Sequence, residues 1–240
     1  MANPWARDRA TRFYLGFGLV GLAVIGLGFS TTYILPMAKR SFSAPWFVHL
    51  HGAACLSWVV LVIVQSQLVR TSRTPVHRRL GQVALPLAFI VWACGIATQV
   101  WATRRDLPAL GPVATSGLLG TVSGLSLFLL LVIAAIATRR RPDWHKRLVM
   151  LATIQVLWPA FFRLRHLLPF VPKPEISFAL VLAYLAIIVA AARDKWRYGR
   201  VHPVWLFIGP ALFIEQCAEV ALFDSPAWRR LGQSLFAILS

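Results

Sequence analysis

Residues 141–168 read RPDWHKRLVMLATIQVLWPAFFRLRHLL, and this stretch decides the class of fold. A basic segment that contains His145 precedes a long apolar run, and Arg163, Arg165 and His166 lie near the far end of that run. A helix from His145 to Arg163 would be roughly 27 Å long, which is close to the hydrocarbon thickness of a bilayer. The stretch therefore predicts a transmembrane helix with polar groups at both membrane surfaces.

The composition of the whole chain supports a membrane protein. Of its 240 residues, 58% are hydrophobic and only 14% are charged, whereas charged residues make up about 25% of soluble domains. The formal net charge is +17, but the basic residues lie between the apolar runs, where membrane proteins carry them. The chain is therefore predicted to be an integral membrane protein whose partner is the lipid bilayer and not a nucleic acid.

The apolar runs predict an all-α polytopic helical bundle that forms one membrane domain over residues 1–240. A basic N-terminus at residues 1–12 precedes seven spans within residues 13–223, and an interfacial helix follows at residues 225–240. Pro36 is expected to end the first span, while Ser225 and Pro226 are expected to begin the last helix. The spans are expected at about 13–35, 46–69, 80–102, 113–138, 148–168, 176–192 and 204–223.

Two further patterns concern orientation and packing. Lys and Arg are more numerous in the segments that lie on the same side of the membrane as the N-terminus, which predicts a protein of the cytoplasmic (inner) membrane with its N-terminus inside and its C-terminus outside. Residues 16–21 read GFGLVG, a formal dinucleotide-binding match without the required preceding strand, so close helix packing is the better interpretation. Three cysteines inside apolar runs are interpreted as packing residues and not as metal ligands: Cys55, Cys94 and Cys217.

A repeated motif provides the first candidate cofactor site. Residues 77–81 read HRRLG and residues 145–148 read HKRL, so each motif places a histidine at the start of an outward-going span. Imidazole is a common ligand of haem iron and of other metals. His77 and His145 are therefore predicted to hold haem b between adjacent hairpins, with Arg78 and Arg147 facing its propionates. The alternative is that both histidines cap helices or contact lipid phosphates.

A second polar cluster is predicted at the outer side, and it allows three interpretations. His51 and His166 could be a second pair of haem ligands. A non-haem site for iron, zinc or copper could instead use five residues: His49, His51, His166, Glu215 and Glu219. The third interpretation is a buried charge network that fixes helix packing: Arg163, Arg165, Glu215 and Glu219.

Residues 46–170, which contain these motifs, resemble a group of uncharacterised bacterial polytopic membrane proteins. The shared elements are His49 and His51 in the second span, the HRRLG and HKRL motifs, and a fifth span that ends in Arg163 and Leu168-Pro169. That group is distantly similar to the di-haem transmembrane cytochromes b, whose four-helix core holds haem between histidines. The resemblance implies a helical bundle that binds haem.

These observations lead to one expected function and two alternatives. We expect a membrane redox protein, an oxidoreductase-type electron carrier that exchanges electrons with a quinone or another redox partner. The first alternative is a metal-dependent membrane enzyme that uses the outer cluster. The second is a non-enzymatic carrier or assembly factor, in which Arg163 and Arg165 bind an anionic lipid or substrate and the two glutamates relay protons.

Overall fold

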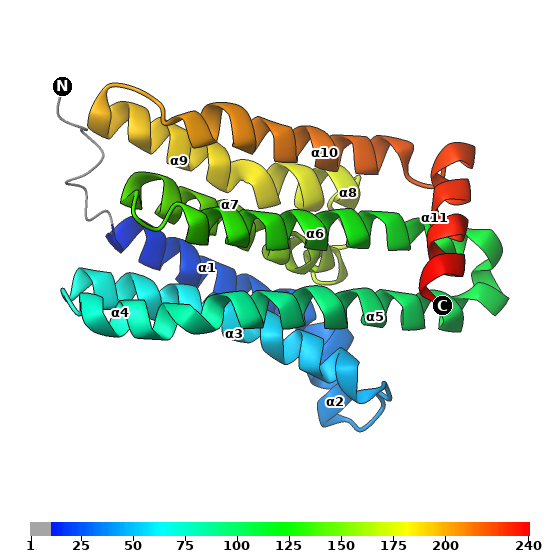
Figure 1. The fold of residues 1–240 in the computed structure, drawn as a ribbon. Coiled ribbons are helices and arrows are strands. Elements are labelled where there is room, and N and C mark those ends of the chain that lie inside the picture. Colours follow the sequence, from blue (N-terminus) through cyan, green and yellow to red (C-terminus); the bar gives the residue numbers. More distant parts are fainter. Residues whose placement is uncertain (1–10) are drawn as a thin grey trace.

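The computed structural model describes residues 11–240, and every regular element in that range is helical (Figure 1). Six continuous helical stretches are long and apolar enough to cross a membrane. One of them, Thr74–Ala137, has 64 residues and folds back between α5 and α6, so the described chain forms seven rods. The predicted all-α membrane bundle is confirmed. Most of the predicted basic N-terminus lies outside the described residues.

The first half of the described chain contains eight helical elements, which make up the first three rods of the bundle and the turn after them. They are α1 (Thr11–Phe29), η1 (Ser30–Ile34), α2 (Leu35–Ala38), α3 (Trp46–Arg70), α4 (Thr74–Leu80), η2 (Gly81–Val83), α5 (Ala84–Leu110) and η3 (Gly111–Thr115). The second half contains α6 (Ser116–Ala137), α7 (Pro142–Arg163), η4 (Leu164–His166), α8 (Pro174–Ile176), η5 (Ser177–Leu182), α9 (Ala183–Tyr198), η6 (Val204–Ile208), α10 (Gly209–Leu222) and α11 (Pro226–Leu239).

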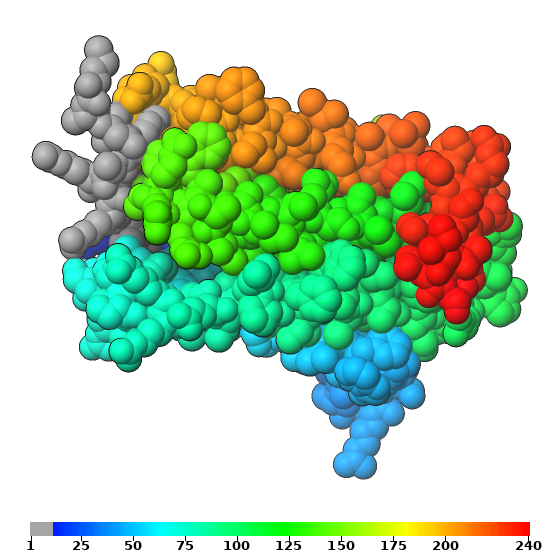
Figure 2. All heavy atoms as spheres, in the orientation of Figure 1, coloured from blue at the N-terminus to red at the C-terminus, as the bar shows by residue number. Residues whose placement is uncertain are grey.

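The bundle is organised around α7, the helix of the opening stretch. In the apolar part of this span 61% of the residues are buried, against at most 33% in the others. Figure 1 shows α6 and α7 between the α1–α3–α5 side and the α9–α10 side. We call the two ends of the bundle the α4 end and the α11 end. Figure 2 shows that the segment around α2 projects from the side of the bundle.

Helices extend beyond the predicted spans in several places, including α7, which begins at Pro142, and α9, which continues to Tyr198. The expected loop at residues 70–79 is wrong, because α4 begins at Thr74 with a proline in its first turn and continues through η2 into α5. His77 therefore lies on a helix. At the other end of this rod, α5 runs past the expected end of the third span at about residue 102 and continues to Leu110. Gly111 ends it with a φ of 59°, a conformation that favours glycine.

Pro36 does not end the first span, contrary to the expectation from sequence. The helix passes through a wide turn at η1, where the Leu35 N–H donates to the Ser30 carbonyl five residues earlier. This π-type turn lets the chain enter α2, where the proline occupies the first turn and needs no N–H donor. Two further π-type segments, η5 and η6, occur in the last two spans.

The glycines of α1 allow close contact with two neighbouring helices. A Cβ on Gly18 would lie 2.7 Å from the Ile63 side chain on α3, and one on Gly21 would lie 2.9 Å from Leu157 on α7. Farther along α1, a Cβ on Gly28 would clash with the Ala160 carbonyl of α7. The packing interpretation of the glycine motif is confirmed, since α1 could not approach either helix this closely with larger side chains.

The C-terminal helix α11 lies across one end of the bundle (Figure 1). Ser225 accepts a hydrogen bond from the Trp228 N–H, with proline at the first helical position, so the predicted helix start is confirmed. The Trp228 indole donates to the Ser116 carbonyl at 2.9 Å. Gly232 is buried against the Thr115 backbone. These contacts dock α11 onto the turn between α5 and α6.

Candidate cofactor and charge sites

The two motif histidines come together at the α4 end. His77 on α4 and His145 on α7 have ring centroids 6.5 Å apart, with an angle of 88° between the ring planes. Both side chains are partly buried. The paired HRRLG and HKRL motifs therefore do bring their histidines to one place in the fold.

Hydrogen bonds orient these rings. The Nδ1 of His145 lies 2.8 Å from the Ala135 carbonyl, which fixes the N–H on Nδ1 and leaves Nε2 with its lone pair. A backbone carbonyl is a common partner for the second nitrogen of a metal-binding histidine. His77 lies beside the backbone of Gln65 on α3, and its Nδ1 is buried without a hydrogen bond in residues 11–240.

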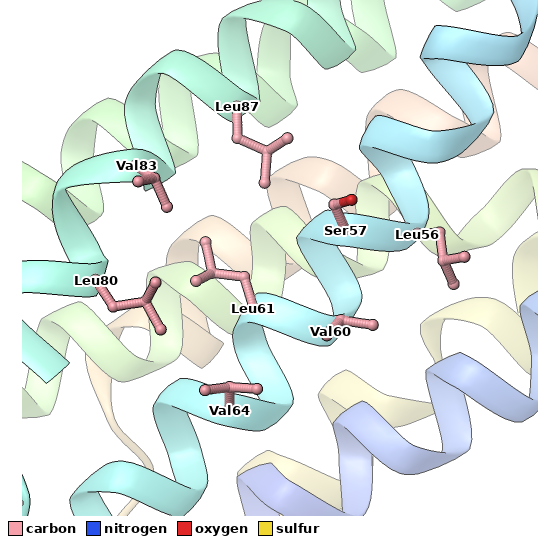
Figure 3. Close-up of a pocket in the computed structure, with 8 residues that line it drawn as sticks. All are labelled: Leu56, Ser57, Val60, Leu61, Val64, Leu80, Val83 and Leu87. Atoms are coloured by element: carbon pink, nitrogen blue, oxygen red, sulfur yellow. The ribbon is translucent and has the colours of Figure 1, made fainter. Parts of the chain in front are cut away.

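The separation of the rings suits two ligands on one metal ion. With metal–nitrogen bonds of roughly 2.0 Å, two opposed imidazoles have ring centres about 6 Å apart. An apolar groove of about 370 Å³ (Figure 3) includes Leu80, which follows His77 by three residues in the chain. It lies between α3 and the α4–α5 rod, and it is lined by Leu56, Ser57, Val60, Leu61, Val64, Leu80, Val83 and Leu87. The imidazole pair and this apolar surface fit the type of residues that a haem requires.

The two candidate propionate ligands have different environments. Arg78 is exposed at the α4 end, but Arg147 is completely buried and its guanidinium holds Asp194 with N–O distances of 2.7 and 2.8 Å. It also donates to the backbone carbonyl of Asp143 at 2.7 Å. The expectation that Arg147 faces a propionate is corrected, because its donors are directed at these internal acceptors. No sequence pattern had indicated Asp143 or Asp194 as a site residue.

The buried ion pair belongs to a larger polar group. The Trp205 indole donates to Asp194 at 2.8 Å. Nearby, His202 is buried with its Nε2 3.4 Å from the Asp143 carboxylate, while its Nδ1 accepts the Val204 N–H at 3.2 Å. The histidine is therefore held neutral, with its proton on Nε2. Burial lowers the pKa of His202 below its usual value, and the Arg147 guanidinium acts in the same direction.

The predicted outer metal site is not assembled. Nowhere in residues 11–240 do three His, Cys, Asp or Glu side chains converge as metal ligands would. The His49 ring is hydrogen-bonded to the Tyr33 hydroxyl at 2.8 Å, whereas His51 lies 3.1 Å from the Val91 carbonyl on α5. His166 is exposed in η4. These histidines lie on different sides of their helices. The predicted metal site of five ligands is therefore wrong. A second haem between His51 and His166 stays a prediction.

The predicted ion pairs between α7 and α10 are absent from the described contacts. Arg163 donates to the Pro159 carbonyl at 3.0 Å and lies 4.5 Å from the centre of the Phe29 ring. Arg165 lies over the ring of Phe162, 3.7 Å from its centre. Arg163 therefore has a carbonyl partner on its own helix and an aromatic partner on α1, whereas Arg165 has its aromatic partner on α7. The predicted charge network, which joined Arg163 and Arg165 to Glu215 and Glu219, is therefore wrong.

Glu215 and Glu219 instead lie against α6. The Glu219 carboxylate occupies the space over Gly120, where a Cβ would clash with it. Glu215 lies close to the Ser123 hydroxyl, and its Oε2 is buried without a hydrogen-bond partner among the described residues. The two carboxylates are one helical turn apart on α10.

Three neutral side chains connect α7 to these carboxylates. Gln155 Nε2 donates to the Tyr184 hydroxyl at 3.3 Å, and that hydroxyl donates to Gln216 Oε1 at 3.3 Å. Gln216 Nε2 then reaches Glu219 at 3.5 Å. The i, i+4 spacing of the glutamates predicted a shared face, but nothing in the sequence indicated this hydrogen-bonded chain across three helices.

No family model, curated protein or solved structure matches the chain. Its chemistry therefore has to follow from its own residues. The three cysteines are free thiols of intermediate exposure.

Proposed function

We propose that this chain is an integral membrane redox protein that binds haem b between His77 and His145 and transfers electrons. The observation that carries the proposal is the pairing of the two motif histidines, with ring centroids 6.5 Å apart. Two histidines that merely contacted lipid phosphates would have no reason to meet across two helices. Haem held in this way would supply reversible one-electron oxidation and reduction.

The residues around the pair have defined tasks in this proposal. The hydrogen bond from His145 Nδ1 to the Ala135 carbonyl holds the imidazole in one tautomer, so Nε2 would be the atom that binds the haem iron. His77 approaches from α4, which is tied by a turn of only three residues to α3. Arg78 is the exposed cation next to His77 and is available to a propionate. The groove in Figure 3 offers apolar side chains to the macrocycle.

The proposed setting is a bacterial inner membrane with the α4 end on the cytoplasmic side. Arginine is abundant in the segments at that end, and the positive-inside rule places such segments in the cytoplasm. A quinone in the bilayer, or a second redox protein at the surface, is the proposed electron partner. We propose no soluble substrate.

A visible absorption spectrum tests the proposal directly. The protein is expressed with added haem precursor and purified in detergent, and haem is measured by the Soret band and by pyridine haemochrome. We expect a Soret band in the parent protein and its loss in both His77→Ala and His145→Ala. His49→Ala is the matched control, because the His49 ring is hydrogen-bonded to the Tyr33 hydroxyl and is not a proposed haem ligand, and it should retain the band. A parent protein without a Soret band, or two alanine variants that keep it, would overturn the proposal.

A further inference from the structure

Two carboxylates in the α11 half of the bundle lack a basic partner among the described residues. The described contacts of Glu215 and Glu219 are with Ser123, Gln216 and the Gly120 region of α6. None of the ion pairs in residues 11–240 includes either glutamate. Two uncompensated charges one helical turn apart inside an apolar bundle are costly. The pair therefore requires a positive counter-charge that these residues do not supply.

The neutral chain beside the pair points its donors in one direction. Each group from Gln155 through Tyr184 to Gln216 donates to the next, and the last donor faces Glu219. An acceptor at the end of such a chain is stabilised as an anion, while its neighbour Glu215 has only the single Ser123 hydroxyl beside it. The two carboxyl groups thus have unequal surroundings, which suits one proton held by the pair.

A buried oxygen on α7 gives an independent indication of a ligand. Gln155 is 2% exposed, and its Oε1 has no hydrogen-bond partner among the described residues. That oxygen faces α6, because a Cβ on Gly124 would lie 3.9 Å from it. Gly120, which faces the Glu219 carboxylate, lies one turn along the same side of α6. The two glycines therefore lie on one side of α6, with the unpaired Gln155 oxygen beside Gly124 and the Glu219 carboxylate beside Gly120.

We propose that Glu215 and Glu219, with the Gln155–Tyr184–Gln216 chain, form a proton-binding site within the membrane bundle. A proton taken from a hydronium ion, which is left as water, forms an O–H bond with one carboxylate oxygen, and the charge of the pair changes from two negative charges to one. A metal cation fits less well, since the described residues contain no cluster of three acidic, thiol or imidazole ligands. This site is separate from the histidine pair and does not depend on haem.

Labelling with dicyclohexylcarbodiimide tests this site, because the reagent modifies protonated carboxyl groups in apolar surroundings. The intact protein in detergent is treated over a range of pH, and the modified glutamate is identified by peptide mass spectrometry. We expect labelling at Glu215 or Glu219 that decreases as the pH rises and disappears in the Glu215→Gln/Glu219→Gln double variant. Glu175 is exposed at the start of α8 and is the internal control, which should stay unlabelled.

A second set of labelling reactions distinguishes a bound proton from a bound metal cation. Labelling is repeated with sodium chloride and with choline chloride at constant pH and ionic strength. Equal labelling supports the proton site, whereas specific protection by sodium would overturn it in favour of a metal cation. Thermal melting shows whether the glutamine variants are folded, and Glu175→Gln is the matched substitution. Absence of labelling in the folded parent protein at every pH would also overturn the proposal. None of these outcomes depends on a Soret band.

Discussion

Replacing Asp194 with asparagine removes the counter-charge of a completely buried guanidinium. The side chains of Arg147 and Asp194 are 0% and 1% exposed, and one carboxylate oxygen accepts hydrogen bonds from Arg147 Nε and the Trp205 indole and lies 2.7 Å from Arg147 Nη2. Removing one partner of a buried ion pair costs about 3–5 kcal/mol of unfolding free energy. For a chain of this size, about 2–4 °C per kcal/mol gives a fall in melting temperature of roughly 6–20 °C.

The assay is thermal unfolding of detergent-solubilised protein, followed by tryptophan fluorescence and by size-exclusion chromatography after heating. Asp106→Asn is the matched control, because Asp106 pairs with Arg105 at the surface, with side chains 36% and 55% exposed. Exposed pairs contribute about 0–1 kcal/mol, so this control should melt close to the parent protein.

A double variant examines the physical cause. In Arg147→Met/Asp194→Leu the charge and its partner are both removed, and apolar side chains fill most of the space. We expect this variant to recover much of the stability lost in Asp194→Asn, because the penalty arises from an unpaired buried charge. If Asp194→Asn melts together with Asp106→Asn, the reasoning about the buried pair is refuted.

Three further outcomes are expected from the same melting assay or from proteolysis. The pKa of His202 is lowered by burial, so the folded protein binds a proton at His202 less well than the unfolded chain does. Stability should therefore fall as the pH decreases through about 6.5. His202→Asn should weaken this dependence, and an unchanged pH profile in that variant would count against a role of His202. Gly28→Ala should cost about 1–3 kcal/mol by overpacking, whereas Gly26→Ala on the same helix meets no atom within 4 Å and should melt like the parent; equal melting of the two would contradict the packing argument. Gly232→Val should release α11 and speed tryptic cleavage there, while Gln233→Val at an exposed position should not; equal cleavage rates would show that the glycine contact does not hold the helix.

The fold class followed from the apolar runs because a bilayer demands long helices with internally satisfied backbone groups. The approach of His77 to His145 also agreed with the sequence, since repeated motifs at span starts lie at equal depth. Helix ends were less predictable. Pro36 and residues 70–79 were expected to form turns by rules that hold for water-exposed segments, and tertiary packing overrides those rules here.

The partners of the charged residues could not be inferred from sequence. Arg163 and the two glutamates were placed at similar depth, but depth does not determine the rotation of a helix about its axis. Arg163 turns toward Phe29 on α1, while the glutamates turn toward α6. The pairing of Asp194 could not be predicted for another reason. Asp194 lies in a basic segment that resembles a solvated loop, and only the packing of α7 against α9 buries it with Arg147.

The wide turn η6 determines which way the remainder of the last rod faces. Each residue added to or removed from an α-helix rotates everything beyond it by roughly 100°, and a π-type turn inserts such a step without breaking the rod. Shortening η6 by one residue would therefore keep α10 helical yet swing Glu215 and Glu219 from α6 toward lipid. A single wide turn near the α4 end thus determines which neighbouring helix Glu215 and Glu219 face, several turns farther along the chain.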